Sequence, residues 1–111
     1  MLLKIGDKIP DFSIDAYHHA KICKVRSSHF KEKWLVVAFY PADFTFVCPT
    51  ELEELADNYG KFTSMGAEIL SISVDSPIDH KKWHDSYTGI NKIEYPMGSG
   101  WESIWLIRDI Y

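Results

Sequence analysis

The stretch Trp34–Tyr40, with the sequence WLVVAFY, decides the fold prediction for this chain. All of its side chains are apolar, and most are β-branched or aromatic. A continuous apolar run of this length is typical of a strand that is buried on both faces of a sheet. Pro41 follows directly and ends the predicted strand, because proline cannot continue a hydrogen-bonded ladder. The run therefore predicts a central strand.

A helix is predicted after this strand, over residues 48–62. Pro49 suits the first helical turn, where its missing N–H costs nothing. The acidic residues Glu51, Glu53 and Glu54 lie near the positive end of the helix dipole. One face of the segment is apolar at helical spacing, and it carries Leu52, Leu55, Ala56, Tyr59 and Phe62.

The following segments predict a second strand–helix pair. Residues 67–75 read as another buried strand, and Ser76-Pro77 with Asp79 is the pattern of a capped helix start. We expect Gly89 to end that helix and residues 92–97 to form a short strand. Strands that alternate with helices in this way predict an α/β fold with parallel strand pairs.

The two ends of the chain differ in character. Residues 12–16 and 21–25 alternate apolar and polar side chains, which predicts two half-buried strands joined by a loop over 17–20. Residues 27–33 predict a short helical or turn segment. Residues 98–100 (GSG) are expected to break the chain, and the aromatic, apolar tail 101–111 is prone to aggregation if exposed.

Composition narrows the function classes. The chain has 111 residues, 12 Lys plus Arg and 16 Asp plus Glu, so its formal charge is −4. A mildly acidic chain without a basic run is a poor binder of nucleic acid or anionic membranes. The sequence shows no apolar stretch of membrane-spanning length and no signal-peptide pattern. With only two cysteines, Cys23 and Cys48, we expect a cytoplasmic protein with reduced thiols.

Cys48 is the strongest candidate for chemistry. It follows the loop after the predicted central strand and opens the predicted helix. Only about 3% of an ordinary thiol is ionised at neutral pH, and the first turn of a helix can stabilise the thiolate. Thr45, in the loop, carries a hydroxyl that can donate to the sulfur or to a bound oxygen. The alternative is that Cys48 is a buried, unreactive small residue. Glu51 stands where a C-x-x-C motif would have its second cysteine, which argues against thioredoxin-type dithiol exchange.

The run FYPADFTFVCPTE over residues 39–51 resembles the active-site segment of the peroxiredoxins, in the alkyl hydroperoxide reductase C and typical two-cysteine (AhpC/TSA) branch. Its P-x-x-x-T-x-x-C pattern is met by Pro41, Thr45 and Cys48. The resemblance continues at residues 6–12, 73–76 and 80–83. We therefore expect a peroxiredoxin domain over residues 3–98.

The resemblance implies a thioredoxin-like fold and the reduction of hydrogen peroxide or organic hydroperoxides without a metal or organic cofactor. Cys48 is implied as the thiolate that attacks the peroxide and becomes a sulfenic acid. Thr45 is implied to bond the thiolate and the peroxide oxygen, Pro41 to shield the pocket, and Glu51 to be a supporting polar residue. The implied reductant is a thioredoxin or a flavoprotein disulfide reductase, and the implied assembly is a homo-oligomer.

The sequence also departs from the family pattern. The downstream arginine and the C-terminal resolving cysteine of the family have no counterpart here, and Arg108 and Cys23 do not take their places. Residues 99–111 do not resemble the family. The sequence therefore predicts a thioredoxin-like fold that is incomplete at its C-terminus, as in a truncated peroxiredoxin.

The sequence also allows other functions. One alternative hypothesis is that the chain is an inactive peroxiredoxin fragment or an interaction module. A Cys–His hydrolase would need His29, His80 or His84 beside Cys48. His80 and His84 have the spacing of a metal-binding pair on a helix, but we expect them to lie on a solvated helix face.

Overall fold

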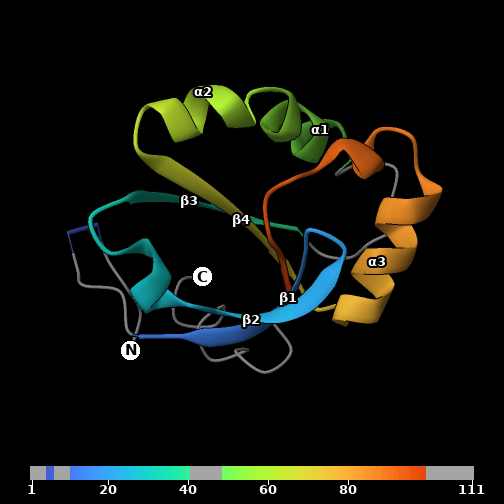
Figure 1. Cartoon of the computed structure of the whole chain (residues 1–111), viewed down its shortest axis with the longest axis horizontal. Helices are drawn as coiled ribbons and strands as arrows, with labels where there is room; N and C mark the ends of the chain where they lie inside the picture. Colours follow the sequence, from blue (N-terminus) through green and yellow to red (C-terminus); the bar gives the residue numbers. More distant parts are fainter. Residues whose placement is uncertain (1–4, 7–10, 41–48, 100–111) are drawn as a thin grey trace.

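The computed structural model describes residues 5–6, 11–40 and 49–99 of the chain. In this part of the chain, five strands form one sheet in the order β2-β1-β5-β4-β3. The strands are β1 (Ser13–His18), β2 (Lys21–Arg26), β3 (Trp34–Phe39), β4 (Ala67–Ser73) and β5 (Met97–Ser99). The helices are η1 (Ser27–Phe30), α1 (Pro49–Asp57), α2 (Tyr59–Ser64), α3 (Pro77–Ser86) and η2 (Ile90–Lys92). The predicted α/β architecture is confirmed (Figure 1).

The sheet is mixed. β3 pairs with β4, and β4 with β5, in parallel, whereas β1 pairs antiparallel with both β2 and β5. The predicted hairpin is therefore present, but its loop is shorter than predicted. β1 continues through His18, and only His19 and Ala20 turn the chain, both with positive φ (50° and 63°). Two residues with positive φ give a turn whose twist matches that of the flanking strands.

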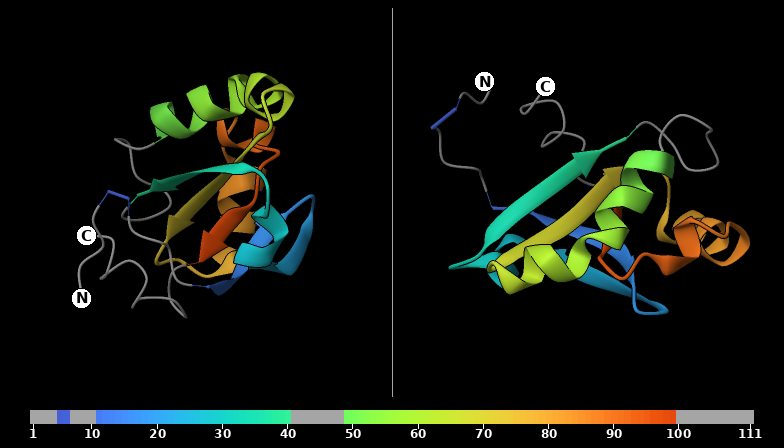
Figure 2. Two further views of the ribbon diagram at one scale, coloured as in Figure 1. Left: turned by 90° about the vertical axis from the view of Figure 1, so that its left-hand side faces the viewer. Right: turned by 90° about the horizontal axis from the view of Figure 1, so that it is seen from above.

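Two apolar cores lie on opposite faces of the sheet. Side chains from β1, β3 and β4 alternate between them, as strand geometry requires. One core includes Tyr17, Ile69 and Met97 and packs against α1, α3 and η2, and the other includes Ile14, Leu70 and Ile72. Figure 2 shows α1 and α2 lying along one side of β3 and β4. The helices thus bury one face of the parallel strands.

The prediction that Trp34–Tyr40 is buried on both faces is wrong for most of its length. In the described residues, β3 is the last strand of the sheet and pairs with β4 alone. Leu35–Phe39 are half-buried, Trp34 is 80% exposed, and Tyr40 is buried. A strand at a sheet edge has one neighbour, so its side chains gain less cover than those of β4.

The helix predicted over residues 48–62 is divided at Asn58. α1 ends at Asp57 and α2 begins at Tyr59. The Asn58 side chain donates to the backbone carbonyl of Glu54 at 2.8 Å. Asn58 has φ −105° and ψ 7°, away from α-helical values, although its backbone N–H keeps the helical bond to the Glu54 carbonyl at 3.1 Å.

The helix predicted from Ser76 begins as expected but ends early. Ser76 caps α3 by accepting a hydrogen bond from the backbone N–H of Asp79 at 3.2 Å. α3 ends at Ser86 rather than near Gly89, because the Tyr87 backbone is extended and its carbonyl accepts from Ile90 and Asn91. Those bonds start η2, whose Ile90 is buried.

The strand predicted over 92–97 lies further along the chain. β5 spans Met97–Ser99, so Gly98 and Ser99 belong to an inner strand and do not form a breaker. Ile93 and Tyr95 are buried before the strand begins. A Cβ on Gly98 would lie 2.6 Å from Ile14 Cδ1 and 3.1 Å from the Ser71 carbonyl oxygen. The missing side chain therefore lets β5 fit between β1 and β4.

Candidate active site at the carboxyl end of β3

The candidate site lies where the parallel strands end. β3 ends at Phe39, and α1 begins at Pro49, so the segment carrying the P-x-x-x-T-x-x-C motif joins these two elements. The carboxyl ends of parallel strands meet at one edge of a sheet, which is where open α/β sheets bind their ligands. The predicted site residues Pro41, Thr45 and Cys48 lie outside the described residues. The structure describes what flanks them.

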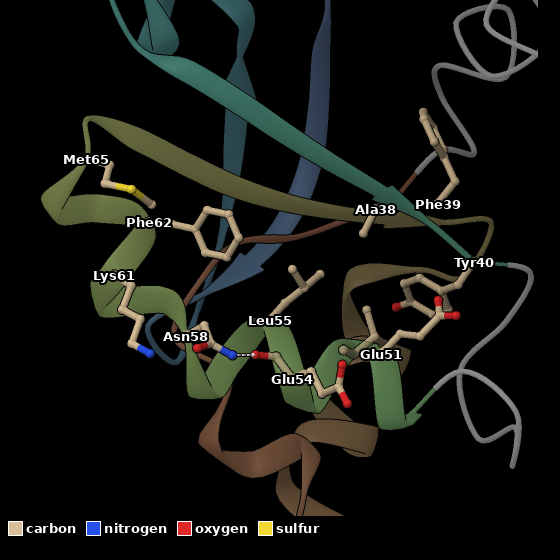
Figure 3. Close-up of a pocket in the computed structure, with 11 residues that line it drawn as sticks. Ala38, Phe39, Tyr40, Glu51, Glu54, Leu55, Asn58, Lys61, Phe62 and Met65 are labelled. Atoms are coloured by element: carbon tan, nitrogen blue, oxygen red, sulfur yellow. Dashed lines mark hydrogen bonds between the residues drawn. The ribbon is translucent and has the colours of Figure 1, made fainter.

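Glu51 is the predicted site residue that the structure describes. It lies in the first turn of α1 and its side chain is exposed. Together with Tyr40 it lines a cavity of about 510 Å³ between β3 and the helices α1 and α2 (Figure 3). Most of the other lining residues are apolar, among them Phe39, Leu55 and Phe62. Glu51 therefore lies at the junction of this cavity with the start of α1.

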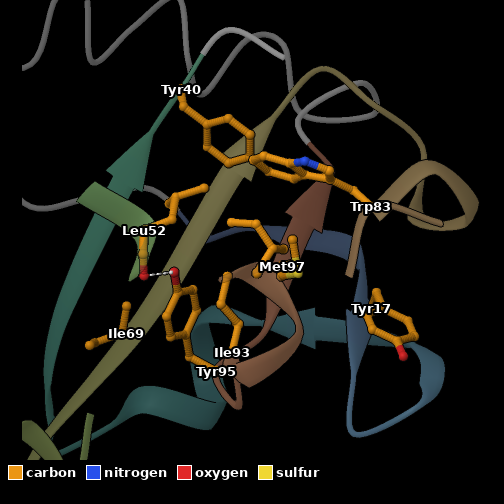
Figure 4. Packing of buried hydrophobic residues seen from close by; sticks show 9 residues of the cluster. Tyr17, Tyr40, Leu52, Ile69, Trp83, Ile93, Tyr95 and Met97 are labelled. Carbon is orange, nitrogen blue, oxygen red and sulfur yellow. Dashed lines mark hydrogen bonds between the residues drawn. The ribbon is translucent and has the colours of Figure 1, made fainter. Parts of the chain in front are cut away.

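Tyr40 is the described residue that leads directly into the motif. Its backbone N–H donates to the Ile72 carbonyl at 3.1 Å, which extends the β3–β4 pairing by one residue. Its buried ring packs against Trp83 of α3, with the ring centroids 5.9 Å apart (Figure 4). Its hydroxyl oxygen lies 3.5 Å from Nδ1 of His80. Tyr40, the residue directly before the motif, is thus held by contacts of both its backbone and its side chain.

His80 is buried, so the prediction that it lies on a solvated helix face is wrong. Its side chain has 0% exposure, and its Nε2 lies 3.0 Å from the Gly98 carbonyl oxygen. His84 is part-buried, and its Nε2 lies 3.0 Å from the Ile93 carbonyl oxygen. The strands β1 and β5 and the segment 90–96 pack against this side of α3, and these contacts between distant segments cannot be read from the helix sequence. One feature of the sequence indicates this burial: His80 lies three residues before the buried Trp83, a spacing that puts both side chains on the same face of the helix.

The hydrogen-bond partners of the histidines are relevant to two hypotheses from the sequence, a metal site at His80 and His84 and a Cys–His hydrolase. The Nε2 atoms of His80 and His84 are each within hydrogen-bond distance of a backbone carbonyl, and Nδ1 of His29 accepts from the Arg26 N–H at 3.3 Å. Within the described ranges, no cluster of three or more His, Cys, Asp and Glu side chains is placed to hold a metal ion.

The second cysteine has an ordinary structural environment. Cys23 lies on β2, is half-buried, and packs against the core that contains Val25. Burial raises the pKa of the Cys23 thiol, and the nearby Asp15 carboxylate raises it further. Both effects disfavour the thiolate. Cys23 is therefore less disposed to form the reactive thiolate than an ordinary thiol.

No described helix is long and apolar enough to cross a membrane; the longest, α3, has 10 residues.

The fold is shared with solved peroxiredoxins. The structure superposes on the crystal structure of Enterococcus faecalis AhpC with a TM-score of 0.86 at 39% sequence identity, covering 96% of this chain and 65% of that one. It superposes equally well, with a TM-score of 0.86 at 30% identity, on reduced Plasmodium vivax 2-Cys peroxiredoxin, covering 95% and 67% of the two chains. A Plasmodium yoelii peroxiredoxin that is described as forming an artifactual octamer matches with a TM-score of 0.84 at 29% identity, covering 96% and 64%. The predicted thioredoxin-like fold is thereby confirmed.

Sequence comparisons give the same family. Alkyl hydroperoxide reductase C of Pseudomonas aeruginosa is 39% identical over 93 residues, and that of Bacillus subtilis is 43% identical over 93 residues. The protein of the same name from Staphylococcus epidermidis is 45% identical over 95 residues. Each alignment covers 84% of this chain and 50% of the relative, so the chain spans about half the length of these relatives. The sequence model of the AhpC/TSA family matches residues 5–103, and the chain belongs to this family.

Proposed function

We propose that the chain is a thiol peroxidase in which Cys48 reduces hydrogen peroxide and organic hydroperoxides. The observation that carries the proposal is that the motif from Pro41 to Cys48 ends at the residue before Pro49, the first residue of the nine-residue helix α1. The unpaired N–H groups and the dipole of a helix start favour a thiolate there. Membership of the AhpC/TSA family supports the same reaction.

In the proposed reaction the Cys48 thiolate attacks the terminal oxygen of the peroxide. A sulfur–oxygen bond forms, the O–O bond breaks, and the leaving alkoxide or hydroxide takes up a proton. The sulfur is oxidised by two electrons to a sulfenic acid, and the peroxide is reduced to an alcohol or water. Thr45 is proposed to hydrogen-bond the thiolate and the peroxide oxygen, and Pro41 to keep water from the sulfur.

Glu51 is proposed to support this site as a polar residue. Its place in the first turn of α1, beside the cavity that Tyr40 also lines, supports that role. The apolar lining of the cavity is compatible with the carbon chain of an organic hydroperoxide.

The reaction cycle also needs a reductant. Two equivalents of thiol return the sulfenic acid to the thiol, with formation of a disulfide and water. We propose that thioredoxin or a flavoprotein disulfide reductase supplies these reducing thiols. This cycle suits a reducing compartment such as the cytoplasm. We also propose a homo-oligomer, which the resemblance to the typical two-cysteine branch implies.

The test measures sulfenic-acid formation at each cysteine after a short hydrogen peroxide pulse, by trapping with dimedone and mass spectrometry. Cys23 is the internal control in the same molecule, because burial raises its pKa. We expect Cys48 to be oxidised at least about tenfold faster than Cys23, and Thr45→Val to slow Cys48 alone. Equal and slow oxidation of the two cysteines would favour the inactive-fragment reading.

A further inference from the structure

A buried polar chain connects three elements next to the motif. His80 of α3 lies between the Gly98 carbonyl of β5, 3.0 Å from Nε2, and the Tyr40 hydroxyl, 3.5 Å from Nδ1. His80 has 0% exposure and Tyr40 has 8%. Buried polar groups of this kind are costly unless they are satisfied, so the arrangement specifies one geometry.

The contact with Gly98 determines which way the second hydrogen bond runs. A backbone carbonyl can only accept, so Nε2 of His80 carries the hydrogen. In a neutral imidazole the other nitrogen, Nδ1, is then an acceptor, and the Tyr40 hydroxyl donates to it. At 3.5 Å this is a long hydrogen bond. The Tyr40 ring also packs against Trp83, and this contact helps to keep the hydroxyl directed toward His80.

Tyr40 has a second fixed point in its backbone. Its N–H donates to the Ile72 carbonyl at 3.1 Å, so main chain and side chain are both held at the last residue before Pro41. The direction in which the chain leaves β3 depends on the orientation of this residue. We propose that His80 is a positioning residue of the Cys48 site and that it acts through Tyr40. This inference rests on the proposed peroxidase function.

Two conservative variants separate the two contacts of His80. In His80→Asn the side-chain oxygen can take the place of Nδ1 and accept from Tyr40, and the contact with Gly98 is lost. In His80→Gln the amide nitrogen can take the place of Nε2 and donate to Gly98, and the contact with Tyr40 is lost. A merely structural role predicts that the two variants behave alike when they are equally stable.

The measured quantity is the rate of sulfenic-acid formation at Cys48 relative to Cys23 in the same molecule, together with the urea midpoint of each variant. We expect His80→Gln to slow Cys48 roughly three- to tenfold, the factor for one lost buried hydrogen bond, and His80→Asn to stay within about twofold of the wild type. Tyr40→Phe is expected to match His80→Gln, and the double variant Tyr40→Phe with His80→Gln to be no slower than either single variant. His84→Gln, one helical turn away, is the control and is expected to leave the rate unchanged.

The outcomes are distinguishable. A wild-type chain in which Cys48 reacts no faster than Cys23 contradicts the proposed function and the positioning role together. A fast wild type with equal rates in His80→Asn and His80→Gln, or additive losses in the double variant, overturns the positioning role alone. Should the His80 variants unfold, Tyr40→Phe keeps the test valid, because an unchanged Cys48 rate in that variant overturns the proposal.

Discussion

The Tyr95 hydroxyl donates a hydrogen bond to the Leu52 carbonyl oxygen at 3.0 Å, across 43 residues of sequence. Both residues are buried, and the bond ties the segment before β5 to the first half of α1 (Figure 4). It therefore helps to fix the helix that begins directly after Cys48 against the sheet.

Removing this hydroxyl is expected to destabilise the fold. Tyr95→Phe keeps the ring packing and leaves the bond unmade, so we expect the free energy of unfolding to fall by about 1 kcal/mol. Urea unfolding followed by tryptophan fluorescence measures the change. Tyr87→Phe deletes the same atom from an exposed side chain and is expected to change stability by less than about 0.5 kcal/mol. Equal effects in the two variants would contradict the assigned role of the Tyr95–Leu52 bond.

The same residue predicts a loss of stability at alkaline pH. Burial raises the pKa of the Tyr95 phenol above its ordinary value of 10.0. Below about pH 10 both folded and unfolded chains keep this proton, so Tyr95 adds no pH dependence. Above it the unfolded chain loses the proton first, and the free energy of unfolding falls by up to about 1.4 kcal/mol per pH unit until the folded pKa is reached.

Urea titrations between about pH 9 and about pH 11 test this sign. Tyr95→Phe is expected to show a shallower decline than the wild type over this range. The Tyr59 phenol, whose pKa is also raised by burial and by its bond to Glu68, is present in both proteins and cancels from the comparison. Parallel declines in the two proteins would show that Tyr95 does not titrate as its burial requires.

Gly98 is expected to tolerate no side chain. In Gly98→Ala the new methyl group would meet Ile14 Cδ1 at 2.6 Å, and we expect a loss of about 1–3 kcal/mol in the free energy of unfolding. Ile14→Val removes that Cδ1 atom, so the double variant should recover part of the loss. In Gly60→Ala, on α2, the methyl group has no neighbour within 4 Å, and helix propensity favours the alanine. A loss at Gly60 as large as at Gly98 would rule out the steric explanation.

Trp34 is expected to promote self-association through the edge of the sheet. It is 80% exposed on β3, whose second edge is unpaired within the described residues. A lysine on an edge strand opposes pairing with another chain, so Trp34→Lys should lower light scattering with a stability change within about 0.5 kcal/mol. Ile78→Lys removes an exposed apolar residue from α3 and leaves the strand edge unchanged. A reduction of scattering by Ile78→Lys equal to that by Trp34→Lys would show that the edge is not the cause.

The sequence by itself determined the elements whose signals are local. Alternation predicted the β1–β2 hairpin, apolar runs predicted β3 and β4, and the Ser76-Pro77 pattern predicted the start of α3. The motif from Pro41 to Cys48 identified the family, because a long run of specific residues depends on no tertiary information. Strand periodicity, helix capping and motif spacing all act within a few residues of the chain.

Tertiary structure decided what depends on contacts across the sequence. β5 spans Met97–Ser99, where Gly98 lies close to Ile14, and Tyr95, two residues before the strand, bonds to the Leu52 carbonyl instead. The burial of His80 follows from its packing against the neighbouring strand β5, whereas its polar side chain favoured a solvated helix face in the sequence. Burial and strand order are set by packing between distant segments, whose free energy exceeds the local preferences that a sequence pattern records.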